Sequence, residues 1–139
     1  MVLVSVDGPA APAEVWRRYT SPAAWPGWAP QITYVDTADD PIRAGTHGVV
    51  HGPLLLRVPF TILDVDPAGR RWSWRVGVGP LGLRMEHGVD ASPSGSVAWV
   101  EIHAPRLLVL PYLPIARLAL RRAVSAEDDQ SEALRRSAE

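Results

Sequence analysis

The feature that most constrains the fold of this chain is an alternation of apolar and polar residues that runs from Gln31 to His103. A period of two is typical of strands that bury one face. Clusters of Gly, Pro, Asp and Ser interrupt the alternation at short intervals and indicate turns. The pattern predicts strands at about 31–37, 45–51, 54–65, 70–78, 81–90 and 96–103. Because sequential strands with short connections pair with their neighbours, we expect an antiparallel meander.

The segments before this region predict one more strand and two short helices. Val2, Val4 and Val6 recur at every second position, which indicates a strand. Residues 11–19 indicate a helix, because Pro12 suits a first helical turn. The Pro- and Trp-rich passage that follows leaves room for at most one further helical turn, which we expect Pro26 to end.

The C-terminal third predicts one long helix. Pro111 and Pro114 bracket its start, and neither Gly nor Pro follows between Ile115 and about Arg136. Such a helix would be roughly 30 Å or more in length, enough to cross a whole sheet. Ser125 precedes an acidic cluster, so residues 125–139 are expected either to continue this helix or to form a separate or frayed end.

Composition limits the chemistry. The chain has 139 residues, 47% of them hydrophobic, and no linker divides it, so we expect a single domain over 1–139 with its own core. The absence of cysteine excludes thiolate metal sites and cysteine nucleophiles. The sequence also lacks lysine, which excludes lysine Schiff-base chemistry and a Walker-type phosphate loop. The formal net charge of -1 points to neither nucleic acid nor an anionic membrane surface as a partner.

The apolar segments indicate a cytoplasmic protein. Residues 1–7 have neither the basic region nor the apolar run of a signal peptide. The longest apolar stretch, 107–120, is interrupted by Pro111, Pro114 and Arg117, and it is too short to cross a bilayer. We therefore expect a cytoplasmic location and no membrane insertion.

Three stretches, in this order, resemble a known family. They are the helix-like segment Ala11–Trp16, the passage Ser21–Pro30 with its pattern S-P-x-x-W-P-x-W-x-P, and Met85–His87 followed by the Gly turn at 92–96. Together with the order of predicted elements, they resemble the START/Bet v 1-like superfamily, also labelled SRPBCC or polyketide cyclase/dehydrase. The resemblance covers essentially the whole chain.

The resemblance implies an α+β helix-grip fold. In this fold a curved seven-stranded antiparallel sheet wraps around a long C-terminal helix, with two short N-terminal helices and a cavity for a hydrophobic ligand. Members of the superfamily include aromatic polyketide cyclases, lipid and sterol carriers, hormone receptors and self-resistance proteins for reactive natural products. A fold shared by so many activities does not choose among them.

Strand parity predicts the wall of this cavity. Trp72 and Trp74 share one face of their strand with Val76 and Val78, and Leu83, Met85 and His87 share a face of the next with Val89. These apolar faces are expected to form one concave wall. Ligand contact and ordinary core packing explain the tryptophans equally well. The resemblance places Trp28 near the cavity mouth, while Tyr112 could supply a hydroxyl and Ala116 belongs to the apolar stripe of the last helix.

His87 is the candidate catalytic residue. Its parity places a titratable group among apolar neighbours, as expected of a general acid or base in a cavity. A core histidine bonded to a backbone carbonyl or to water would show the same pattern. On the last strand, the face with Val100 is the more apolar and is expected inside; the opposite orientation would let Glu101 pair with His87.

No metal or nucleotide cofactor is expected. His47 and His51 would stand about 13 Å apart on a strand, and Glu101 with His103 offers too few ligands. The segment 77–82 matches G-x-G-x-x-G, but Pro80 and the alternation after it indicate a hairpin rather than the helix that a dinucleotide loop opens.

The functional expectation is binding of a hydrophobic, aromatic or polycyclic small molecule between the sheet and the last helix, by a monomer or homodimer. One alternative is a polyketide cyclase or dehydratase that uses the same cavity, with His87 moving a proton. Another is a sequestering or self-resistance protein for a reactive natural product.

Overall fold

The computed structural model describes residues 1–77 and 82–125. The described elements, in chain order, are β1 (Val2–Gly8), α1 (Pro12–Thr20), η1 (Pro22–Ala24), α2 (Trp25–Trp28), β2 (Tyr34–Thr37), β3 (His47–His51), β4 (Arg57–Asp66), β5 (Arg71–Val76), β6 (Leu83–Ser92), β7 (Gly95–His103), α3 (Arg106–Val109), η3 (Leu110–Tyr112) and α4 (Leu113–Ala123). Val78, expected on the face of Trp72 and Trp74, lies outside the described residues.

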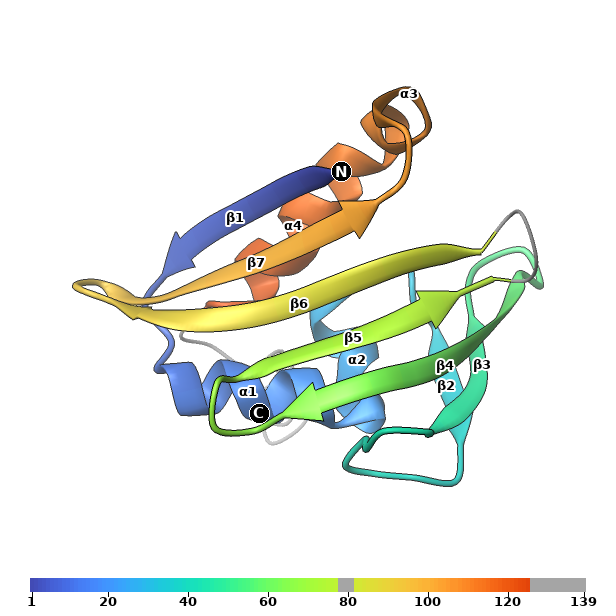
Figure 1. Cartoon of the computed structure of the whole chain (residues 1–139), viewed down its shortest axis with the longest axis horizontal. Helices are drawn as coiled ribbons and strands as arrows, with labels where there is room; N and C mark the ends of the chain where they lie inside the picture. Colours follow the sequence, from blue (N-terminus) through green and yellow to red (C-terminus); the bar gives the residue numbers. More distant parts are fainter. Residues whose placement is uncertain (78–81, 126–139) are drawn as a thin grey trace, which may run out of the picture.

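The strands form a single seven-stranded sheet in the order β1-β7-β6-β5-β4-β3-β2 (Figure 1). Every pairing is antiparallel, and β2 to β7 form a meander in which each strand pairs with the next. The first strand joins the sheet beside the last, with Val2 opposite Ile102. The predicted seven-stranded antiparallel sheet with short N-terminal helices and a C-terminal helix is therefore confirmed.

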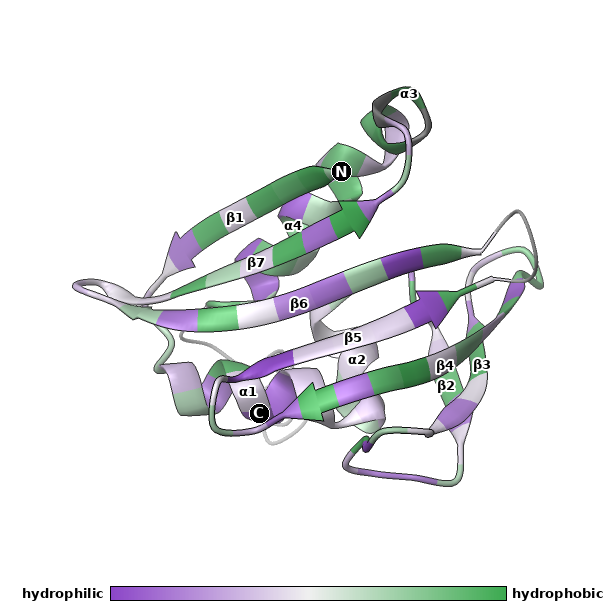
Figure 2. Cartoon of the chain, in the orientation of Figure 1, coloured by the Kyte–Doolittle hydropathy of each residue, from purple (hydrophilic) through white to green (hydrophobic). Residues whose placement is uncertain are grey.

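Helices α1, α2 and α4 lie on the same face of the sheet (Figure 1). Apolar and polar residues are interspersed along β6 and β7 (Figure 2), and one face of each strand is buried under the helices. On β7 this face carries the buried residues Ala98, Val100 and Ile102. The expectation that this face of the last strand lies inside is correct, because burying it removes the larger apolar area from water.

Helix α4 packs on β1 and β7 through small side chains. Ala116, Ala119, Leu120 and Ala123 are all buried. Alanines let the helix backbone approach the sheet closely, so one face of α4 is core while Leu118 on another face is exposed.

Of the two expected outcomes for the C-terminal helix, a continuous helix to about Arg136 is wrong at Val124, whereas the alternative of a helix that ends near Ser125 agrees with the described residues. The helix ends at Ala123, with Val124 outside helical geometry (φ -95°, ψ 4°). The carbonyls of Ala123 and Ser125 accept hydrogen bonds from the Arg18 guanidinium at 2.7 and 2.8 Å, and the Val124 carbonyl accepts one from the backbone N–H of Ala10 at 2.9 Å. These hydrogen bonds give partners to carbonyl groups at the end of the helix. Residues 126–139, the rest of the expected tail, lie outside the described residues.

Other boundaries differ from expectation by a few residues, and two of them have a local cause. Pro26 was expected to end a helical turn, but it lies in the first turn of α2, where a missing N–H costs nothing. Strand β4 begins at Arg57 rather than 54, because Leu54 and Leu55 both adopt left-handed backbone conformations (φ 59° and 63°). The tight turn that contains them is closed by a hydrogen bond from the Gly52 N–H to the Leu56 carbonyl at 2.9 Å.

Candidate ligand-binding cavity

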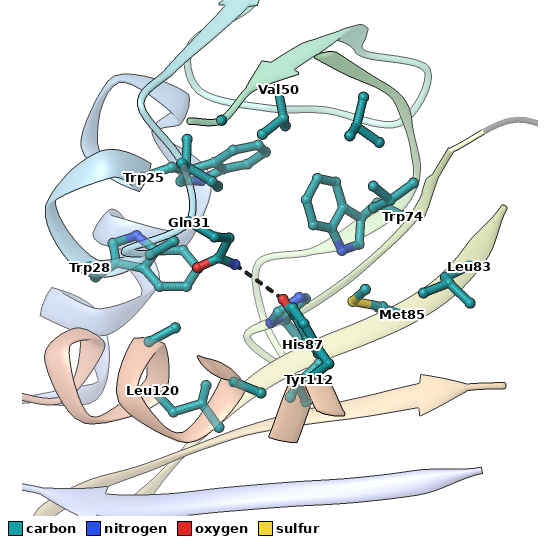
Figure 3. Close-up of a pocket in the computed structure, with 18 of the residues that line it drawn as sticks. Trp25, Trp28, Gln31, Val50, Trp74, Leu83, Met85, His87, Tyr112 and Leu120 are labelled. Carbon is teal, nitrogen blue, oxygen red and sulfur yellow. Dashed lines mark hydrogen bonds between the residues drawn. The ribbon is translucent and has the colours of Figure 1, made fainter. Parts of the chain in front are cut away.

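A cavity of about 330 Å³ lies between the concave face of the sheet and helices α2 and α4 (Figure 3). Side chains from β3 to β7 form one wall and those from α2, η3 and α4 the other. Its described lining residues are Trp25, Trp28, Ala29, Gln31, Ile32, Val50, Gly52, Pro53, Leu56, Val58, Trp72, Trp74, Val76, Leu83, Met85, His87, Val100, Tyr112, Ala116, Ala119 and Leu120.

The sheet wall follows the predicted parity. Trp72 lies opposite His87 in the β5–β6 register, and Trp74 lies opposite Met85. Leu83 follows at the end of the same pairing, so a period of two places all five side chains on the cavity face. The sequence-predicted wall is thus assembled as expected.

The helix wall depends on two tryptophans that begin and end α2. Trp25 donates its indole N–H to the Tyr19 carbonyl at 2.8 Å, and Trp28 donates to the Arg18 carbonyl at 3.1 Å. Both bonds fix the rings against the end of α1. Trp25 then stacks on Trp72 with 5.7 Å between ring centroids and 16° between planes, so aromatic surfaces from helix and sheet meet at the cavity.

Gln31 and Tyr112 connect the two sides of the cavity. The Gln31 side-chain amide donates to the Tyr112 hydroxyl at 3.1 Å, which joins the segment after α2 to η3 (Figure 3). Burial raises the pKa of the Tyr112 hydroxyl, and the hydrogen bond from Gln31 partly opposes that rise. The hydroxyl therefore stays protonated at neutral pH.

His87 lies at the back of the cavity between two aromatic rings. It stacks on Trp72 with 4.5 Å between centroids and 9° between planes, and the edge of Tyr19 packs against it at 5.6 Å. Neither imidazole nitrogen has a hydrogen-bond partner among the described residues. Burial lowers the pKa of His87 to about 3. The ring is therefore neutral at physiological pH, where it can donate one hydrogen bond and accept another but acts only as a weak base.

Glu101 does not pair with His87. In the β6–β7 register His87 lies opposite Val100, whereas Glu101 lies opposite Glu86 on the other face of the sheet. The Glu101 carboxylate is 3.8 Å from the His103 imidazole. Glu86, Glu101 and His103 bring one potential ligand atom each within 4.8 Å on this outer face, so the structure adds Glu86 to a pair that the sequence alone left too small for a metal site.

All eight residues expected to contact a ligand line this one cavity: Trp28, Trp72, Trp74, Leu83, Met85, His87, Tyr112 and Ala116. The sequence reasoning missed Trp25, Gln31 and the hairpin residues Leu56 and Val58. Parity along 54–65 could have found Leu56 and Val58, which alternate. No local signal marks Gln31, because its position depends on how the segment after α2 folds over the cavity.

Charge is excluded from the described part of the lining. It contains no acidic side chain and no arginine. Its polar groups are those of Gln31, Tyr112, His87 and the tryptophan N–H groups. The buried Arg18 lies elsewhere, with its guanidinium bonded to the end of α4. The cavity is therefore suited to an uncharged, largely apolar molecule.

A curved antiparallel sheet, helices on its concave face and an apolar cavity between them define the helix-grip fold. The sequence matches the family described as polyketide cyclase / dehydrase and lipid transport over residues 2–138, and the chain belongs to this family. The resemblance found in the sequence is confirmed. None of the curated proteins matches the chain in sequence.

Solved structures share the fold at low sequence identity. The crystal structure of Ara h 8.0201 has a TM-score of 0.63 at 14% identity, over 85% of this chain and 93% of that one. Protein BH1534 of Bacillus halodurans has a TM-score of 0.67 at 14% identity, over 88% and 95%. Protein MLL2253 of Mesorhizobium loti also has 0.67, at 16% identity over 88% and 89%. Among the described helices, none has the length and apolar character needed to cross a bilayer.

Proposed function

We propose that this chain binds a hydrophobic small molecule of aromatic or polycyclic character in the cavity between the sheet and α4. The observation that carries this proposal is the set of four tryptophans, Trp25, Trp28, Trp72 and Trp74, around one uncharged space of about 330 Å³. Flat aromatic surfaces give a flat ligand large contact areas at little entropic cost. Membership of a family described by cyclases and lipid transport supports the same reading.

A second candidate is a polyketide cyclase or dehydratase. The observation that favours it is His87, whose two ring nitrogens have no protein partner within the described residues that line the cavity. Such a ring could transfer a proton at a hydroxyl or carbonyl of a bound chain. The pKa of about 3 makes it a weak base, and Glu101 lies on the far face of the sheet, so binding without turnover is the preferred function. In a sequestering or self-resistance role, the protein would bind the ligand and release it without chemical change.

Native mass spectrometry of the freshly purified protein tests binding. We expect an adduct of a few hundred daltons, and solvent extraction of that adduct then gives a compound to incubate with the protein. Recovery of the compound unchanged supports carriage or sequestration, and conversion supports the enzyme. The same spectrum gives the oligomeric state, for which we propose a monomer or homodimer. The cysteine-free composition supports a cytoplasmic location.

A pair of variants on α4 tests where the ligand binds. Ala116 faces the cavity, whereas Leu118 on the same helix is 42% exposed. Ala116→Phe fills the cavity and should abolish binding of the neutral dye Nile red, while Leu118→Phe should leave it unchanged. Equal binding by both variants, or no binding by the unchanged protein in either assay, would overturn the proposed function.

A further inference from the structure

Unpartnered polar atoms are concentrated in the cavity. In the described ranges, six buried side-chain nitrogen and oxygen atoms have no hydrogen-bond partner. Five of them belong to residues that line the cavity: the indole nitrogens of Trp72 and Trp74, both imidazole nitrogens of His87, and the Oε1 atom of Gln31. Buried polar groups are nearly always satisfied in native proteins, so a cluster of exceptions in one cavity requires an explanation.

Three other tryptophans show that the missing partners are not a general property of the residue type. Trp25 and Trp28 donate to backbone carbonyls, and Trp99 on the outer face donates to the Asp90 carboxylate at 3.2 Å. Among the fully buried indole N–H groups of the described residues, those of Trp72 and Trp74 on β5 are the ones without an acceptor.

Trp72, Trp74 and His87, here called the polar triad, lie close together. The ring centroids are 4.5 Å apart for Trp72 and His87, 5.3 Å for the two tryptophans, and 6.1 Å for Trp74 and His87. In Figure 3 the indole nitrogen of Trp74 is directed toward the side of the cavity where His87 and Tyr112 lie. Two residues with indole donors and an imidazole that can also donate therefore lie side by side in one region of the lining.

We propose that the ligand is an uncharged polycyclic ketone or quinone whose carbonyl oxygen accepts hydrogen bonds from the polar triad. A carbonyl oxygen has two lone pairs and can accept from two of these donors at once. A carboxylate would lose its hydration without gaining a cation, because the described lining has no arginine. A bare hydrocarbon would leave every one of the triad's polar atoms unsatisfied. The proposal rests on the proposed binding function and specifies its ligand class.

Three probes with one tricyclic skeleton test this inference: fluorene, 9-fluorenone and 9-fluorenone-2-carboxylate. Titrations followed by tryptophan fluorescence or calorimetry should show fluorenone binding about tenfold more tightly than fluorene, and the carboxylate at least about tenfold more weakly than fluorenone. Fluorenone is the more polar of the first two, so partition into an apolar cavity alone predicts the opposite order.

Matched tryptophan variants assign the effect to the triad. Trp74→Phe removes one donor and keeps an aromatic ring, so fluorenone should bind about fivefold more weakly while fluorene changes less than about twofold. Trp99→Phe, on the outer face, should leave both affinities unchanged. The infrared carbonyl stretch of isotope-labelled fluorenone should shift to lower frequency when it binds the unchanged protein. This measurement does not depend on whether a variant folds.

The outcomes separate the two proposals. Fluorene binding as tightly as fluorenone, tightest binding of the carboxylate, or an unshifted carbonyl stretch would overturn the ketone inference while the binding function stands. Failure of the adduct and dye experiments would overturn the binding function itself.

Discussion

Trp72 and His87 lie directly opposite each other on β5 and β6, and their rings stack with 4.5 Å between centroids and 9° between planes. Trp72 also stacks with Trp25. An imidazole held in this way is shielded from water and has no charged neighbour in the described cavity lining. The neutral ring packs well, whereas the imidazolium would be buried without a counter-charge.

Stability should therefore fall in acid because of His87. Burial lowers its pKa from 6.5 to about 3, so between these values the unfolded chain binds a proton that the folded chain does not. The free energy of unfolding is unaffected by His87 protonation above about pH 6.5. As the pH falls from 6.5 toward 3, the free energy of unfolding decreases by about 1.4 kcal/mol per pH unit because of this residue. Urea unfolding at pH 7, 6 and 5 measures this slope. His87→Phe keeps a ring in the stack and should lower the slope by that amount; an unchanged slope would contradict the assignment.

A second prediction concerns Gly88 on β6, where we expect a larger side chain to clash with a residue of β7. A Cβ atom added to Gly88 would lie 2.2 Å from Cζ2 of Trp99, its cross-strand neighbour, whose ring also packs under the Arg71 guanidinium at 5.0 Å. Gly88→Ala should lower the free energy of unfolding by about 1–3 kcal/mol, because the ring must leave its position. Chemical denaturation gives the value.

A second glycine is the control for that measurement. Nothing lies within 4 Å of a Cβ atom added to Gly27 in helix α2. Gly27→Ala should therefore raise the free energy of unfolding by about 0.5–1 kcal/mol, since alanine is the better helix former. If both variants lost stability equally, close packing at Gly88 would not be the cause.

Sequence reasoning placed the sheet and the cavity wall correctly because strand parity is a local property. Once Trp72 is known to face inward, Trp74 and its cross-strand partner Met85 must do so too. The same logic could not decide between the two faces of β7, and composition alone favoured the correct one. Local periodicity thus predicts which residues share a face, and burial decides which face is inside.

The features that sequence reasoning missed depend on contacts between distant segments. The carbonyls at the end of α4 bond to Arg18 and Ala10, more than 100 residues away, and the local sequence offers only Ser125 and the acidic cluster after it as a signal of that end. The start of β4 is delayed by two leucines in a conformation that leucine rarely adopts, which no propensity predicts.

Those leucines give a third prediction. Leu55 is 95% exposed and has φ 63°, so its side chain contributes little packing while its Cβ strains the backbone. Leu55→Gly and Leu55→Ala remove the same side chain, but only glycine adopts this conformation freely. The glycine variant should be about 1 kcal/mol more stable than the alanine variant by urea unfolding, the reverse of their usual order in regular structure. Alanine equal to or above glycine would show that the turn is not strained.

The last prediction concerns Arg18, a buried residue of α1 that bonds to the C-terminal end of α4. Its guanidinium donates to the carbonyls of Ala123 and Ser125, and it is also 3.5 Å from the Glu14 carboxylate. Arg18→Met keeps much of the apolar stem but leaves the Ala123 carbonyl without this partner, so the free energy of unfolding should fall by about 2–4 kcal/mol.

The neighbouring Arg17 is the matched control for Arg18. Its exposed guanidinium forms an ion pair with the Glu14 carboxylate at 2.6 Å. Such surface ion pairs contribute less than about 1 kcal/mol to stability. Arg17→Met should therefore leave urea unfolding nearly unchanged. Hydrogen exchange at the amides of Val124 and Ser125 should accelerate in Arg18→Met and not in Arg17→Met, because those amides close the last turn of α4. Equal exchange in both variants would show that α4 ends at Ala123 without help from α1.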